Sequence, residues 1–139
     1  MKKLEILGKK YSVKILNYSN SPLAMFIGLE CGEGEDKDLM PITTCLGERY
    51  CEYSFVQLNT SFVNINSPDM SKVWEAVRLL GGEPYTKFGS QVYLGSGFVD
   101  YPLFMFSEDK LKEYDPEGYE AYRDKWIERI PDAQKEYWG

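Results

Sequence analysis

Histidine is absent from the 139 residues of the chain. It is the commonest general base and metal ligand in proteins, and it activates the nucleophile of Ser-His and Cys-His sites. Its absence excludes the most frequent hydrolase mechanisms, while lysine or carboxylate catalysis remains possible. Acid pairs such as Glu83 and Asp100 occur in any acidic protein, and nothing in the sequence brings them together. We therefore expect a protein that is not an enzyme.

Metal and cofactor motifs are missing as well. The three cysteines, at positions 31, 45 and 51, do not have the spacing of a zinc site. The acids of residues 33–38 lack the order of an EF-hand loop, and Gly95-Ser96-Gly97 lacks the lysine of a phosphate-binding loop. The sequence predicts no metal, no cofactor and three free thiols.

No apolar run approaches the length needed to span a membrane, and the first residues lack the apolar region of a signal peptide. We expect a cytoplasmic protein without membrane contact. The net charge is −6, so phosphate backbones repel the chain and direct nucleic-acid binding is not expected. The predicted partner is a protein with a basic surface.

Composition favours a folded domain, because 43% of the residues are hydrophobic and 15% are aromatic. The length fits one α+β domain over residues 1–139, an antiparallel sheet with two main helices packed on it. Strand-like runs, separated by turn-forming residues, occupy 3–7, 11–16, 23–31, 39–46, 53–58, 61–65, 91–94 and 98–106.

The two main helices are predicted at 68–80 and 116–129. In the first, Ser67 is the expected cap, and the apolar stripe that includes Trp74 is expected to face the core. The second opens at Asp115-Pro116, and a short helix follows Ser107. One face of the second helix is expected to consist of Tyr119, Tyr122, Trp126 and Ile130.

Two groups of acids are the candidate binding residues, and the first is preferred to the second. The densest lies on and beside a glycine-bearing loop: Glu30, Glu33, Glu35, Asp36 and Asp38. The second recurs at helical spacing along the C-terminal helix: Glu117, Glu120, Asp124 and Glu128. Neither group is expected to be catalytic.

Several motifs together resemble a known family. They are residues 3–11, 23–27, Thr43-Thr44-Cys45-Leu46, 64–68, the stretch 95–106 with its Ser96-Gly97-Phe98 and Tyr101-Pro102, and 115–119. In this order they resemble domain of unknown function 4313, over about residues 3–125. The resemblance implies a protein of plasmids, phages and integrative elements of gut bacteria. Small acidic proteins of such elements often disarm host defences.

The leading hypothesis is an anti-CRISPR-like inhibitor whose carboxylates imitate DNA phosphates against the basic groove of a nuclease. A second hypothesis is an accessory protein of a mobile element that binds a conjugation or replication protein. A third is a small-molecule binder or enzyme with an aromatic pocket lined by Tyr85, Tyr93, Phe98 and Tyr101.

Overall fold

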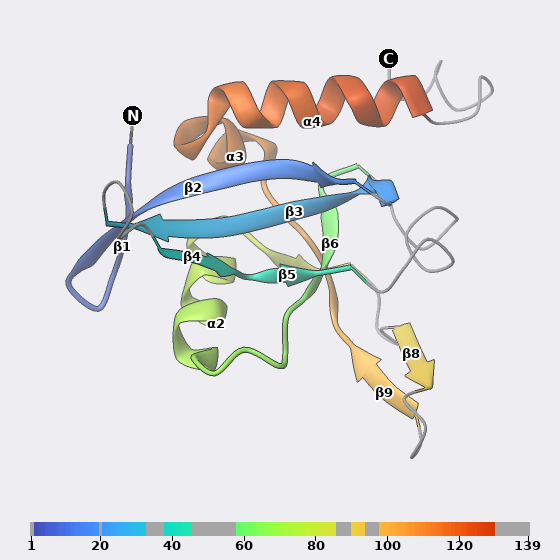
Figure 1. Cartoon of the computed structure of the whole chain (residues 1–139), viewed down its shortest axis with the longest axis horizontal. Coiled ribbons are helices and arrows are strands. Elements are labelled where there is room, and N and C mark those ends of the chain that lie inside the picture. The colour runs from blue at the N-terminus through green and yellow to red at the C-terminus, as the bar shows by residue number, and fades with distance from the viewer. Residues whose placement is uncertain are drawn as a thin grey trace.

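The computed structural model describes residues 2–19, 21–32, 38–45, 58–85, 90–93 and 98–129. Within these ranges the chain forms antiparallel strands and three helices, which confirms the predicted α+β fold. The strands divide into two four-stranded sheets and a separate two-stranded pair (Figure 1).

The first sheet has the strand order β1-β2-β3-β4. Its strands are β1 (Leu4–Ile6), β2 (Lys9–Tyr18), β3 (Ser21–Cys31) and β4 (Asp38–Pro41). Leu7 and Gly8 join β1 to β2 with φ angles of 52° and 79°, as a tight two-residue hairpin turn requires. Side chains alternate between the two faces of a strand, so alternate residues in the central parts of β2 and β3 are buried: Tyr11, Val13, Ile15, Met25, Ile27 and Leu29.

The second sheet has the order β5-β6-β10-β7, and β8 pairs only with β9 among the described strands. The bounds are β5 (Thr43–Thr44), β6 (Thr60–Val63), β7 (Glu83–Pro84), β8 (Ser90–Tyr93), β9 (Phe98–Tyr101) and β10 (Leu103–Met105). The predicted strand 98–106 is divided at Pro102, since proline has no N–H for a sheet hydrogen bond.

Side chains of the second sheet bond to the backbone of β3. The Thr43 hydroxyl accepts a hydrogen bond from Ile27 N at 3.0 Å, and the Ser61 hydroxyl donates to Met25 O at 2.7 Å. Both bonds are buried, so each satisfies polar groups that would otherwise be costly inside the core.

Helix α2 (Met70–Leu79) begins two residues later than predicted. Asp69, not Ser67, is the cap, and its carboxylate accepts a hydrogen bond from Lys72 N at 3.4 Å. The Ser67 hydroxyl accepts from Asp69 N at 3.2 Å and so shapes the turn that precedes the helix. The prediction of Ser67 as the cap is therefore wrong, although both residues have the short polar side chains that caps favour.

Trp74 does not lie in the core, which contradicts the prediction from the apolar stripe of α2. Its side chain is 41% exposed, and its ring lies 5.6 Å from the ring of Phe104, centroid to centroid. The buried residues of α2 are Val73, Ala76 and Val77. The apolar stripe is wider than the contact with the core, and Trp74 lies at its edge.

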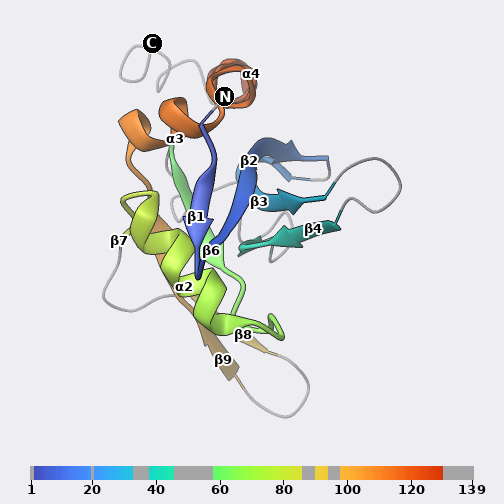
Figure 2. The ribbon, with the colours of Figure 1, turned by 90° about the vertical axis from the view of Figure 1, so that its left-hand side faces the viewer.

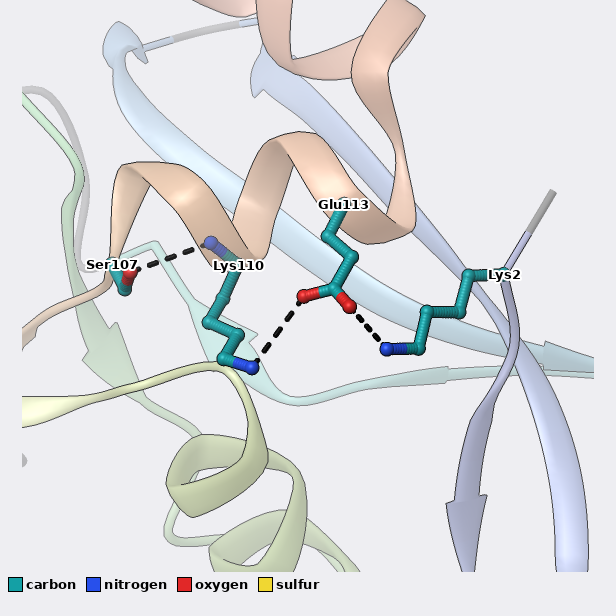
Figure 3. Close-up of polar contacts among 4 residues, drawn as sticks. All are labelled: Lys2, Ser107, Lys110 and Glu113. Carbon is teal, nitrogen blue, oxygen red and sulfur yellow. Dashed lines mark hydrogen bonds and ion pairs between the residues drawn. The ribbon is translucent and has the colours of Figure 1, made fainter.

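Two helices follow the second sheet. Helix α3 (Glu108–Tyr114) is capped by Ser107, whose hydroxyl accepts from Lys110 N at 3.3 Å (Figure 3). Helix α4 (Pro116–Arg129) agrees with the predicted 116–129. It lies along β2 and β3, on the side of the molecule opposite to α2 (Figure 1). None of the described helices is long and apolar enough to cross a membrane.

Candidate functional site

The start of α4 is fixed to the first sheet by Asp115. This carboxylate is 7% exposed, and its two oxygens accept hydrogen bonds from different elements. One accepts from Gly118 N of the helix at 3.1 Å, and the other accepts from Ile15 N of β2 at 2.9 Å. Pro116 occupies the first helical position, where a missing N–H costs nothing. The helix therefore begins at a defined point against β2.

The buried side of α4 is fixed by hydrogen bonds as well as by packing. The Tyr119 hydroxyl donates to Asn59 Oδ1 at 2.8 Å, and the Tyr122 hydroxyl accepts from Asn59 N at 3.0 Å. Burial raises the pKa of Tyr119 to about 12 and also raises the pKa of Tyr122. Trp126 is 1% exposed and continues the same face. These contacts hold the helix in one orientation.

The acids of α4 lie on the opposite, outward side of the helix. Glu117, Glu120, Asp124 and Glu128 are all exposed, and at 100° per residue they fall on one stripe. We call these four residues the acid stripe. It extends about 16 Å along the axis, at 1.5 Å per residue. Among the described residues, none of its carboxylates forms an ion pair.

The spacing of the acid stripe is unfavourable for the helix itself. Glu120, Asp124 and Glu128 follow one another at intervals of four residues. Like charges at this interval destabilise a helix by about 0.2–0.5 kcal/mol per pair, whereas alternating signs would stabilise it. The arrangement presents negative charge outward at a small cost to the stability of the helix.

The first predicted group of acids does not form one surface in the described residues. Glu30 is half-buried in β3, whereas Asp38 is exposed at the start of β4. The sheet pairs Cys31 with Asp38 and Glu30 with Leu39. Paired residues share a face and successive residues alternate, so Glu30 and Asp38 point to opposite faces. Residues 33–37, with the other three acids Glu33, Glu35 and Asp36, lie outside the described residues.

The predicted aromatic pocket is described only in part. Tyr85 follows β7, is 41% exposed, and lines an open cavity of about 340 Å³ together with Pro84 and Phe106. The side chains of Tyr93, Phe98 and Tyr101 lie outside the described part of the structure. Within that part, no three cysteine or acidic side chains converge as metal ligands, and Cys31 is a free thiol.

The role of Asn59 is not predicted by any pattern in the sequence. This residue has a φ of 67°, a left-handed conformation that asparagine tolerates better than most residues. Its amide oxygen and its backbone N–H bond the two tyrosines of α4, and its carbonyl accepts from Phe106 N at 2.8 Å. The only local signal was an asparagine directly before a strand-like run, which indicates a turn but not its partners.

Comparison with curated proteins and with solved structures finds no match. A family model, by contrast, matches residues 12–126, which include β2 from Ser12 onward, β3, β4, all of the second sheet, and most of α4. The resemblance seen in the sequence is thereby confirmed at the level of the family. The chain belongs to the family described as Domain of unknown function (DUF4313).

Proposed function

We propose that this protein is a non-enzymatic inhibitor that binds a nuclease of host defence, such as a CRISPR nuclease, through the acid stripe of α4. In this proposal a mobile element of gut bacteria encodes it. The observation that supports it best is the combination found on α4. Four outward carboxylates lack ion-pair partners among the described residues, and they stand on a helix whose other side is fixed by Asp115, Tyr119 and Tyr122.

The chemistry of the partner follows from the charge. A nuclease groove contacts nucleic acid mainly through lysine and arginine, which neutralise phosphates. A row of carboxylates offers the same groove anionic oxygens, and arginine binds carboxylate and phosphate with the same fork of N–H groups. Cations of the partner would also relieve the repulsion along the acid stripe.

Rigidity contributes to this mode of binding. Ordering mobile side chains and loops on association costs free energy, so a surface that is already fixed binds more tightly than a mobile one. The hydrogen bonds of Asp115 and Asn59 supply this preorganisation for α4. The net charge of −6 adds long-range attraction, which raises the association rate at low salt.

The test compares two variants with the same change in charge. The first is the triple variant Glu117→Lys, Glu120→Lys and Asp124→Lys, which reverses the acid stripe. The control is Glu5→Lys, Glu83→Lys and Asp109→Lys, three exposed acids on other elements. Both are added to a panel of CRISPR nucleases in a plasmid-cleavage assay, after circular dichroism and thermal unfolding show that they are folded.

The proposal predicts that the wild type and the control inhibit one nuclease of the panel. Inhibition by the acid-stripe variant should weaken by about a hundredfold or more, and inhibition by the wild type should weaken steeply with salt. Equal inhibition by the two variants would exclude the acid stripe as the binding surface. The nuclease assignment itself fails if the wild type inhibits none of the panel, or if pull-downs recover a conjugation or replication protein in its place.

A further inference from the structure

A second cavity lies at the other side of the molecule from α4. It has a volume of about 310 Å³ and lies where the first sheet meets α2. Figure 2 shows α2 beside the end of β1, with β2, β3 and β4 following in order across the sheet. Polar or titratable side chains that line it are Lys9 and Tyr11 of β2, Cys31 of β3, Asp38 of β4 and Lys72 of α2.

The register of the sheet explains why these groups meet. Ser12 of β2 pairs with Glu30 of β3, so the next residues of these antiparallel strands, Tyr11 and Cys31, also lie opposite each other. Cys31 in turn pairs with Asp38 of β4, so Tyr11, Cys31 and Asp38 form a row across the inner face of the sheet. The neighbouring row on this face is apolar and contains Val13, Leu29 and Met40. The cavity is therefore the place where the core-facing side of the sheet changes from apolar to polar.

Tyr11 has a buried hydroxyl without a partner. The residue is 5% exposed, and no described group accepts a hydrogen bond from its hydroxyl or donates one to it. Most buried polar groups in proteins are hydrogen-bonded, so this hydroxyl retains the capacity to bond a ligand that enters the cavity. The other polar groups of the cavity indicate the chemistry of that partner.

Two ammonium groups lie over the ring of Tyr11. Lys9 Nζ is 5.9 Å and Lys72 Nζ is 5.6 Å from the ring centroid. The Tyr11 hydroxyl and then Asp69 raise the pKa of Lys72, so the hydroxyl is near the ammonium although it forms no regular hydrogen bond. Lys72 also forms an ion pair with Asp69 at 3.3 Å. An ammonium has three N–H donors, and this pair leaves donors for a ligand.

We propose that this cavity binds a small organic anion, a carboxylate or phosphate head group on a short apolar body. The head group accepts hydrogen bonds from Lys9, Lys72 and the Tyr11 hydroxyl, and the apolar body contacts Leu29 and Met40. The volume is at the lower end of the range of small-molecule pockets, roughly 300–1,000 Å³. The hydroxyl is buried, so the flexible lysine side chains over the ring of Tyr11 move as the ligand enters.

Asp38 allows a more specific test, because its negative charge would repel an anionic ligand. It is exposed and lines the same cavity. A carboxylate at this point repels an anionic ligand, so its removal should strengthen binding while the loss of either lysine should weaken it. A cavity that merely fills with any apolar molecule would not respond to these changes in opposite directions.

The experiment uses the full chain and four probes of similar size or charge. Phenyl phosphate and benzoate carry the two head groups, inorganic phosphate lacks the apolar body, and benzylamine reverses the charge. Binding is followed by NMR titration of the wild type and of the variants Tyr11→Phe, Lys72→Gln and Asp38→Asn. Lys14→Gln is the matched control, because it removes an exposed lysine from the same strand outside the cavity.

We expect phenyl phosphate or benzoate to shift signals of Tyr11 and Lys72 with a dissociation constant of about 1 mM or tighter. Tyr11→Phe and Lys72→Gln should weaken binding about tenfold, Asp38→Asn should tighten it severalfold, and Lys14→Gln should leave it unchanged. The preferred probe identifies the head group. The proposal is overturned if benzylamine binds as well as the anions, if neither organic anion binds at about 10 mM, or if the two weakening variants bind like the wild type.

Discussion

Helices α2 and α4 cover the same core from opposite sides, but different interactions hold them in place. On α4 the buried face consists of Tyr119, Tyr122 and Trp126, and both tyrosine hydroxyls bond to Asn59. On α2 the buried face consists only of smaller apolar residues: Val73, Ala76 and Val77. Large aromatic side chains with a polar end give α4 both more buried area and a defined orientation.

The outward faces of the two helices also differ, in how their charged side chains are paired. The charges of α2 are compensated locally, because Glu75 pairs with Arg78 and Asp69 pairs with Lys72. The acid stripe of α4 has no such partners among the described residues. A fixed orientation and acids without ion pairs among the described residues thus coincide on α4, and this coincidence favours α4 as the surface that meets a basic partner.

The largest expected effect separates the two tryptophans of these helices. Trp126→Ala should lower the free energy of unfolding by about 3–5 kcal/mol, because the side chain is 1% exposed and its removal leaves a cavity. Trp74→Ala should cost about 1 kcal/mol, since the side chain is 41% exposed and loses mainly its contact with Phe104. Urea unfolding of both variants measures the difference, and equal losses would show that α2 and α4 contribute alike.

The contrast between the tryptophans also shows what helical periodicity can predict. On α4 the aromatic residues recur at spacings of three and four and oppose the acids, so the sequence alone identifies the buried face. On α2 the apolar residues outnumber those that the core can cover. Whether Trp74 or Ala76 is buried depends on the elements packed against the helix, which the sequence of the helix does not contain.

For the candidate sites, too, local sequence patterns predict positions within one helix but not contacts between different elements. Helical spacing was enough to place Glu117, Glu120 and Asp124 on one side of α4. Glu30 and Asp38 belong to one dense group of acids in the sequence, yet the sheet register places them on opposite faces. The cavity at Tyr11 shows the converse, because Lys72 reaches it from a helix far away in the sequence. Register and helix docking arise from long-range contacts, so local patterns do not predict them.

A smaller effect tests how closely α4 is docked on β2. Alanine normally stabilises a helix relative to glycine, but a Cβ at Gly118 would lie 2.0 Å from Asp115 Oδ2 and 2.7 Å from Ile15 O. Gly118→Ala should therefore lower the free energy of unfolding by about 1–3 kcal/mol, since the helix start must move from the sheet. Glu120→Ala, at an exposed position of α4, is the control and should change stability little. A stabilising Gly118→Ala would mean that α4 is loosely docked.

The tyrosines of α4 should make stability depend on high pH. In the unfolded chain a tyrosine loses its proton near pH 10, whereas burial raises the pKa of folded Tyr119 to about 12 and raises that of Tyr122 as well. Their contribution is complete below pH 10 and is lost as the pH rises from about 10 through 12, because the unfolded state releases protons first.

Tyr119→Phe should reduce the decrease in the free energy of unfolding at high pH. At pH 8, where the bond to Asn59 is intact in the wild type, the variant should be less stable by about 1 kcal/mol. Tyr85→Phe, at an exposed tyrosine next to β7, should keep the profile of the wild type. Urea unfolding between pH 8 and about 11 gives both quantities. Superimposable profiles for wild type and Tyr119→Phe would show that this hydroxyl is not buried in solution.

The smallest effect concerns the exposed ion pairs of α3 and α2. Glu113 of α3 pairs with Lys2 and, at 3.4 Å, with Lys110 (Figure 3). Lys2 and Lys110 are 52% and 48% exposed, so water and salt screen both pairs. Glu113→Gln should lower the thermal midpoint slightly at low salt and not at all at high salt. Glu75→Gln, which breaks the corresponding pair on α2, should behave in the same way.

Acid provides an independent check on the same carboxylate. The hydrogen bond from Lys2 lowers the pKa of Glu113 below its usual 4.5, so any stabilisation is present above that range and is lost as the pH falls through the folded pKa. The midpoints of wild type and Glu113→Gln should therefore converge in acid. A loss comparable to that of Trp126→Ala would instead mean that the ion pairs of Lys2 secure the N-terminal strand. Surface charge, and not only buried aromatic contacts, would then decide which elements of this fold are rigid.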